Sequence, residues 1–187
     1  MDQYLEESGN VHIPPYFHRD AEPSDAEAYN NVYASEGGSV AAPTAGLHFT
    51  KDILQQVGKE NCSYLNLHVG AGTFKPVLCT DARDHAMHAE TFAVSVYEIR
   101  NIVAALEAGK PLVVVGTTSL RTLESLYWSG VKKIRGQEID PASIEIGQFD
   151  WAPLAVGEGK GITRVAAMMA LLEGLENSDV VSGKTSL

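Results

Sequence analysis

The sequence predicts an α/β protein with a largely parallel sheet and flanking helices. Segments with strand-like apolar patterns alternate with segments that carry helical periodicity and helix-capping residues. One of them, Leu112 to Val115, is wholly apolar, as expected for a strand buried on both faces of a parallel sheet. A chain of 187 residues suffices for one domain, so we expect residues 1–187 to form a single α/β domain.

The first third of the chain favours two helices and one short strand. Ser24 to Glu27 form a capping box, which opens a helix over about 25–34. Residues 39–42 are typical of a short buried strand that ends at the following proline. Thr50 can cap a second helix over about 51–59, which has apolar side chains along one face.

The middle of the chain predicts strands and one well-marked helix. Residues 63–69 alternate apolar and polar side chains, and the strand can resume over 73–78 after a glycine-rich break. Residues 91–96 form another β-like stretch. Ser95 to Glu98 are a second capping box, so we expect a helix from there to Ala108.

The final third begins with the predicted strand 112–115, followed by a short turn and a helix over about 120–128. Residues 129–162 are rich in glycine and proline and predict a long loop or insertion, with one strand near 144–149. A strongly apolar helix is expected over about 163–176, packed into the core.

Net charge argues against indiscriminate binding to nucleic acid. The chain carries 24 acidic and 14 basic residues, a net charge of −10, whereas phosphate backbones are bound by clustered Lys and Arg. Lys132, Lys133 and Arg135 form one tight basic cluster, and Lys160 with Arg164 a looser one. Each is either a solvated loop or a local binding patch.

The sequence also predicts a cytoplasmic protein without a membrane segment. No stretch approaches the ~20 apolar residues that span a bilayer, and the N-terminus is acidic and polar, unlike a signal peptide. Cys62 and Cys79 have no metal-binding spacing, which favours free thiols in a reducing compartment.

The turn Gly116-Thr117-Thr118-Ser119 is the most suggestive local feature. Small residues that lead into a helix N-terminus offer free N–H groups and the positive end of the helix dipole to an anion. Arg121 adds a charge in the first turn. The turn is therefore either a site for a carboxylate or phosphate, or an ordinary N-terminal cap.

Two further segments carry candidate histidines. His68 ends a predicted strand before Gly70 and Gly72, whose spacing allows close approach of a ligand but lacks the rest of a dinucleotide-binding fingerprint. His48 precedes a predicted helix and is either an acid–base residue or a hydrogen-bonded structural one.

Metal and P-loop interpretations are not supported. The pattern of His85, His88 and Glu90 matches no common zinc site, so we expect no metal. Gly183 to Ser186 resemble the end of a P-loop, but Ser178 stands where the motif needs glycine.

Five ordered segments resemble the S-adenosylmethionine:tRNA ribosyltransferase-isomerase family of queuosine biosynthesis. The segments are VYA (32–34), GSVAAPTAGLHFT (38–50), LHVGAGTFKPV (67–77), DHAMHAE (84–90) and VGTTSLRTLES (115–125). The resemblance implies the core part of the family's main α/β domain, without its inserted β-barrel domain. Since the expected N-terminal half and a C-terminal Asn-Phe-His segment have no counterpart, we expect a truncated member.

The resemblance also implies a reaction. Such enzymes transfer and isomerise the ribosyl portion of S-adenosylmethionine onto 7-aminomethyl-7-deazaguanine at the tRNA wobble position, giving epoxyqueuosine and releasing adenine and methionine. S-adenosylmethionine is a co-substrate, so no separate cofactor or metal is implied, and the partners are S-adenosylmethionine and tRNA. The alternative is an inactive fragment or remnant that only binds S-adenosylmethionine or tRNA.

The matched segments supply the candidate site residues. For catalysis these are His48, His68, His88 and Glu90, because the reaction needs a base beside the sulfonium and an acid for the departing adenine. For substrate binding they are Pro43, Thr44, Gly46, Gly70, Gly72, Thr73, Thr117, Thr118, Ser119 and Arg121.

Overall fold

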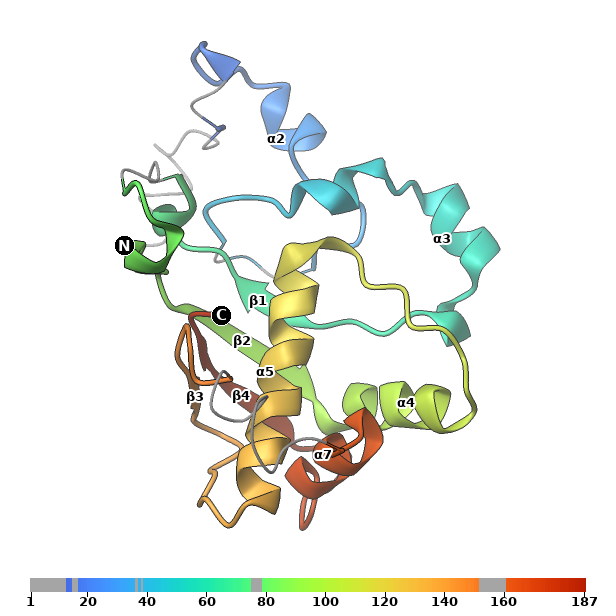
Figure 1. The fold of residues 1–187 in the computed structure, drawn as a ribbon. Coiled ribbons are helices and arrows are strands. Elements are labelled where there is room, and N and C mark those ends of the chain that lie inside the picture. The colour runs from blue at the N-terminus through green and yellow to red at the C-terminus, as the bar shows by residue number, and fades with distance from the viewer. Residues whose placement is uncertain (1–12, 15–16, 36, 38, 75–78, 152–160) are drawn as a thin grey trace.

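A computed structural model describes residues 13–14, 17–35, 37, 39–74, 79–151 and 161–187 (Figure 1). Within these residues a four-stranded sheet has the order β1-β2-β4-β3. The strands are β1 (Asn66–His68), β2 (Glu90–Ser95), β3 (Ile144–Ile146) and β4 (Val180–Thr185). The mixed α/β class predicted from the sequence is confirmed.

The prediction of a largely parallel sheet is wrong, because most strand pairs are antiparallel. β1 pairs with β2 and β2 with β4 in antiparallel fashion, and only β3 and β4 are parallel. The prediction depended on residues 112–115 forming a strand parallel to the one before them. Those residues form no strand, and Val113 is 82% exposed. The chain therefore does not re-enter the sheet directly after the helix that follows β2.

Three helices cover the sheet and close the core. They are α4 (Val96–Glu107), α5 (Gly116–Ile134) and α7 (Arg164–Leu171). α5 contacts β1, β3 and β4 and packs most extensively against α7 (Figure 1). At that crossing a side chain on Gly130 would lie 2.0 Å from the carbonyl oxygen of Ala167, so only glycine allows the two helices to approach this closely.

The core joins the buried face of the sheet to these helices. Fully buried side chains include Phe92 and Val94 of β2, Ile99 of α4, Leu126 of α5 and Leu171 of α7. Alternate residues of β2 are buried, as expected for a strand with one face on the core. Among the described residues, no helix is long and apolar enough to span a membrane.

The N-terminal part contains short elements along the edge of this core. They are α2 (Asp25–Ala28), α3 (Lys51–Val57) and 3₁₀ turns at Thr44–His48, Lys59–Asn61, Ala71–Phe74 and Ala82–Asp84. α3 begins as predicted, because the Thr50 side chain accepts a hydrogen bond from the Ile53 amide. Residues 39–42 form no strand, although Val40 donates a backbone hydrogen bond to Val69.

Several element boundaries differ from the predictions for physical reasons. α2 ends at Ala28, far short of 34, because the backbone leaves the helical region at Tyr29, which has a φ of −102° and a ψ of 44°. At its other end the Ser24 side chain makes no capping hydrogen bond. The predicted strand 63–69 shortens to β1. Residues 71–74 form a 3₁₀ turn where a strand was expected over 73–78, and 75–78 lie outside the described residues.

The C-terminal boundaries also shift. The helix expected over 120–128 is α5, which is longer than predicted and covers residues 116–134. The loop predicted over 129–162 therefore begins only after residue 134, and the strand predicted within it is β3. α7 ends at Leu171, and Gly174 follows with a φ of 82°, which terminates helices readily. Gly183 lies in β4 rather than in a phosphate loop, as expected from its incomplete motif.

Candidate functional site

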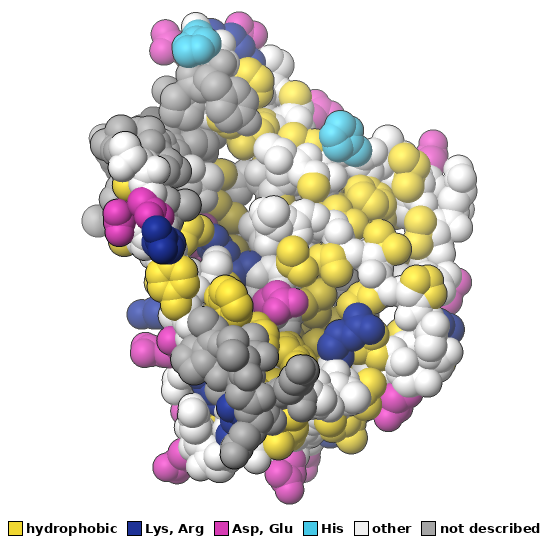
Figure 2. Space-filling model, viewed as in Figure 1, with side chains coloured by type: hydrophobic (Ala, Val, Ile, Leu, Met, Phe, Trp, Pro, Cys, Tyr) yellow, Lys and Arg dark blue, Asp and Glu magenta, His cyan; other side chains and the backbone are white. Residues whose placement is uncertain are grey.

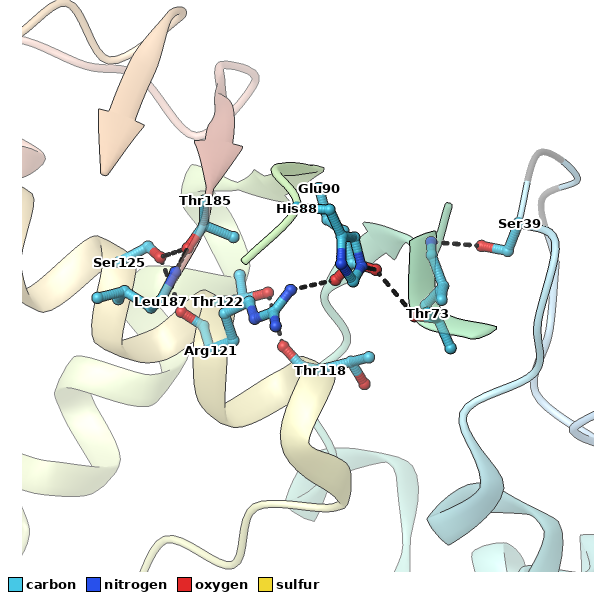
Figure 3. Close-up of polar contacts among 11 residues, drawn as sticks. Ser39, Thr73, His88, Glu90, Thr118, Arg121, Thr122, Ser125, Thr185 and Leu187 are labelled. Carbon is cyan, nitrogen blue, oxygen red and sulfur yellow. Dashed lines mark hydrogen bonds and ion pairs between the residues drawn. The ribbon is translucent and has the colours of Figure 1, made fainter. Parts of the chain in front are cut away.

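A buried carboxylate, Glu90, is the centre of the polar site (Figure 3). Its side chain is 3% exposed, and its Oε2 atom accepts a hydrogen bond from Nη1 of Arg121. The Oε1 atom lies 3.0 Å from Nε2 of His88 and accepts a weaker bond, at 3.4 Å, from the Thr73 hydroxyl. A buried carboxylate is expected to have such partners, because burying an isolated charge is costly.

The sheet and α5 place this carboxylate and its arginine together. Glu90 begins β2 and pairs in register with Thr185 of β4. The Thr185 hydroxyl accepts a hydrogen bond of 2.8 Å from Ser125, whose hydroxyl also lies 2.8 Å from the Arg121 carbonyl oxygen (Figure 3). The strand register and the rotation of α5 are thus tied to each other, and Arg121 is directed at Glu90.

His88 is held between Glu90 and a glycine. A side chain on Gly72 would lie 2.7 Å from Cγ of the imidazole, so the backbone there fits closely against the ring. Because one ring nitrogen contacts Glu90, the tautomer is set by that contact and the other nitrogen is left for a further partner. The His88 side chain is 30% exposed, so solvent and ligands can reach it.

A pocket of about 420 Å³ opens beside Glu90. This volume is in the range typical of small-molecule sites. The lining residues come from the segment before α3, from the segment after β1, from β2 and from the start of α5: Pro14, Tyr29, Ala41, Ala42, Pro43, Thr44, Ala45, Val69, Thr73, Glu90, Gly116, Thr117, Thr118 and Arg121. The lining therefore combines small apolar residues with hydroxyl groups and the Glu90–Arg121 pair.

The N-terminus of α5 forms part of the polar wall. Its N-cap, Val115, offers no side-chain hydrogen bond, so the first amides of the helix are not capped by a side chain. Gly116 has a φ of 85°, a conformation that favours glycine. The helix dipole and free amides at this end are suited to an anion.

The structure brings together many, though not all, of the residues that the sequence suggested. The predicted residues that line the pocket are Pro43, Thr44, Thr73, Glu90, Thr117, Thr118 and Arg121, and His88 and Gly72 lie directly behind Glu90. The predicted residues outside the described lining are His48, His68, Gly46, Gly70 and Ser119.

Those outlying residues have other surroundings. His48 is exposed at the end of a 3₁₀ turn, and His68 lies in the edge strand β1. Gly46 lies against the side chains of Asn31 and Tyr33, which a Cβ would overlap, so its packing is intramolecular. Ala41 and Val69 also line the pocket, and the sequence did not predict them because apolar side chains carry no chemical signature.

The predicted basic cluster is remote from the pocket and partly neutralised. Lys132 forms an ion pair of 2.8 Å with Asp150, and Lys133 lies 3.9 Å from Glu173. Lys132 follows Thr118 by fourteen residues along α5, which corresponds to about 20 Å. In the described ranges, no three His, Cys, Asp or Glu side chains are arranged to hold a metal ion.

A pocket at a helix N-terminus, with the buried Glu90–Arg121 ion pair in its lining, combines apolar surface with a few convergent polar groups, as small-molecule sites commonly do. Residues 1–151 match the family described as queuosine biosynthesis protein, and the chain belongs to this family. Over 130 residues it is 48% identical to the S-adenosylmethionine:tRNA ribosyltransferase-isomerase of Francisella tularensis subsp. novicida (strain U112). Identity to the enzyme of the same name from subsp. holarctica (strain LVS) is 47%.

These matches cover 68% of this chain but 38% of each relative. The chain thus spans well under half the length of the curated relatives that it matches.

Proposed function

We propose that this chain takes part in the S-adenosylmethionine:tRNA ribosyltransferase-isomerase reaction and that the pocket beside Glu90 is part of the S-adenosylmethionine site. In this reaction the ribosyl portion is transferred to 7-aminomethyl-7-deazaguanine at the tRNA wobble position and isomerised to epoxyqueuosine, with release of adenine and methionine. One observation carries the proposal: in a member of this family, a single pocket joins an uncapped helix N-terminus to the buried Glu90 cluster.

The N-terminus of α5 is proposed to bind the methionine carboxylate. Its amides and positive dipole end favour an anion, and the hydroxyl groups of Thr117 and Thr118 lie at the same wall. Arg121 already pairs with Glu90, so its charge is balanced inside the protein. The carboxylate is therefore expected to rely on the helix end more than on the arginine.

His88 is proposed to carry the proton. Removing a proton beside the sulfonium and protonating the departing adenine both need a group that exchanges protons near neutral pH, and histidine is the usual choice. Glu90 would act as a positioning residue, because its contact with one ring nitrogen orients the other. His48 and His68 are weaker candidates, since neither is among the residues described at the pocket.

The short match favours a second candidate function. The chain spans 38% of each relative, and the second candidate is binding of S-adenosylmethionine or tRNA without turnover. Calorimetry with S-adenosylmethionine measures binding, and chromatographic detection of adenine, in the presence of tRNA that carries 7-aminomethyl-7-deazaguanine, measures turnover.

The two candidates give different results. The enzyme binds S-adenosylmethionine and releases adenine, and His88→Gln abolishes release while retaining binding. The exposed His48 provides a matched control: the substitution His48→Gln leaves S-adenosylmethionine binding and adenine release unchanged. Binding without adenine release indicates the second candidate, and absence of binding rejects the pocket as an S-adenosylmethionine site.

A further inference from the structure

The side chain of Gln148 joins two segments that lie far apart in the sequence. Its Oε1 atom accepts a hydrogen bond of 3.2 Å from the Met87 amide, and its Nε2 atom donates one of 2.9 Å to the His85 carbonyl oxygen. Among the described residues, these are the only hydrogen bonds to the backbone of residues 85–88, which form no helix or strand. In this part of the molecule, a single side chain therefore holds the backbone that carries His88.

The amide group of Gln148 takes the place of a neighbouring β-strand. In a parallel pair, one residue bonds to a carbonyl oxygen of the next strand and to the amide two residues further on. The Gln148 side chain makes this pair of bonds with His85 and Met87. Only an amide side chain offers a donor and an acceptor side by side in one plane, so the contact is specific to this residue type.

The sheet brings Gln148 to this position. Glu90 of β2, Thr185 of β4 and Ile146 of β3 are paired in one row across the sheet. Because β2 runs antiparallel to β3 and β4, the residues before Glu90 and those after Ile146 leave the sheet at the same edge (Figure 1). Gln148 is two residues beyond Ile146, and this places it beside the segment 85–88 that leads into β2.

The turn that carries Gln148 is fixed to α5. The Asp150 carboxylate accepts a hydrogen bond of 3.0 Å from the Gly147 amide, which closes the turn, and forms the 2.8 Å ion pair with Lys132 of α5. The same helix supplies the arginine that pairs with the carboxylate beside His88. One helix thus supports both the carboxylate that contacts the imidazole and the turn that holds the backbone of the histidine segment.

We propose that Gln148 is a positioning residue for His88 and acts through the backbone of residues 85–87. By holding that backbone, it keeps one ring nitrogen on Glu90 and leaves the other in place for proton transfer. This inference rests on the proton-transfer role proposed above for His88. The pocket opens beside the start of α5, where Figure 2 shows a hollow with basic side chains at its floor, and its described lining includes neither Gln148 nor His88. Loss of Gln148 should therefore slow turnover without weakening S-adenosylmethionine binding.

The test is the substitution Gln148→Met, which keeps a side chain of similar length and removes both hydrogen bonds. Calorimetry measures the affinity for S-adenosylmethionine, adenine release in the presence of the tRNA substrate measures turnover, and nitrogen-15 NMR of the imidazole measures the tautomer of His88. We expect unchanged affinity and a mixture of His88 tautomers in place of one. Adenine release should be slower by at least about tenfold, because a small displacement of a reacting group is costly. Gln148→Glu keeps only the bond from Met87 and should lie between the wild type and Gln148→Met.

Gln55→Met is the matched control, because Gln55 is an exposed glutamine of α3, and it should change none of the three measurements. An unchanged His88 tautomer in Gln148→Met would overturn the inference, and so would a loss of S-adenosylmethionine affinity as large as the loss of turnover. If Gln148→Met does not fold, Gln148→Glu is judged by the same outcomes. Failure of the proposed function is a different result: the wild type releases no adenine, or His88→Gln leaves release unchanged. The tautomer measurement needs no turnover and still decides whether Gln148 positions the ring.

Discussion

Arg121 donates a hydrogen bond to Glu90 in a setting where neither charge is readily solvated. The side chain of Glu90 is 3% and that of Arg121 15% exposed. A buried ion pair of this kind adds little to the stability of the fold compared with a well-packed apolar pair. Removing one partner, however, leaves the other charge buried and unpaired, which is strongly destabilising. The pair is therefore a sensitive point for the stability of the whole site.

We predict that Glu90→Ala lowers the free energy of unfolding by about 3 kcal/mol, because Arg121 loses its partner. Urea denaturation followed by circular dichroism measures this loss. Arg83→Ala is the matched control, since Arg83 and Asp81 form an ion pair whose side chains are 84% and 39% exposed. Exposed pairs contribute little, so the control should scarcely change stability. Equal losses in the two variants would show that the burial of Glu90 is not decisive.

Gly72→Ala is predicted to displace the His88 ring. The added methyl group would lie 2.7 Å from Cγ of the imidazole, which is closer than any stable contact. NMR of the histidine ring protons should show a changed environment for His88, and adenine release from S-adenosylmethionine in the presence of the tRNA substrate should fall. Gly70→Ala provides the control, because a Cβ at Gly70 has nothing within 4 Å. An unchanged His88 signal in Gly72→Ala would contradict the assigned packing.

Local signals account for the parts of the fold that the sequence predicted well. The sequence predicts β2 and α4 because the β-like stretch over 91–96 meets a capping box at Ser95, and both patterns depend only on neighbouring residues. The run Leu112 to Val115 was misassigned because an apolar strand also needs partner strands. Its sequence indicates burial, but nothing in the sequence places a partner beside it.

The candidate site, too, could be predicted from the sequence only in part. Glu90 and Arg121 each belong to a suggestive segment, but their contact depends on the pairing of Glu90 with Thr185 and on the hydrogen bond from Ser125 to Thr185. These long-range relationships cannot be read from spacing. Gly72 was predicted to let a ligand approach, whereas the structure places the His88 ring there.

Asp25 makes stability depend on pH in the acid range. Its carboxylate accepts two hydrogen bonds of 2.7 Å from Arg19 and one of 2.8 Å from the Glu22 amide. The Arg19 bonds, followed by the Glu22 amide, lower the pKa of Asp25 to about 2. The unfolded-state pKa is about 3.9, so the contribution is complete above that pH and is lost as pH falls towards 2.

The expected result is a stability that declines between about pH 4 and pH 2 in the wild type and less steeply in Asp25→Asn. Thermal unfolding across that range measures the slopes. Arg19→Ala removes the main cause of the low pKa, and carboxyl titration by NMR should then show the pKa of Asp25 moving back towards its usual value. A pKa that stays near 2 in this variant would mean that Arg19 is not responsible.

The two capping boxes offer a direct test of how far a sequence motif predicts stability. The Ser95 side chain accepts a 3.2 Å hydrogen bond from the Glu98 amide at the start of α4, whereas Ser24 makes no such bond. We predict that Ser95→Ala lowers the free energy of unfolding by about 1 kcal/mol, because a helix amide loses its acceptor. Ser24→Ala, matched in chemistry and in motif, should leave stability nearly unchanged. Chemical denaturation of both variants measures the difference, and similar losses would show that the Ser24 motif also caps a helix in solution.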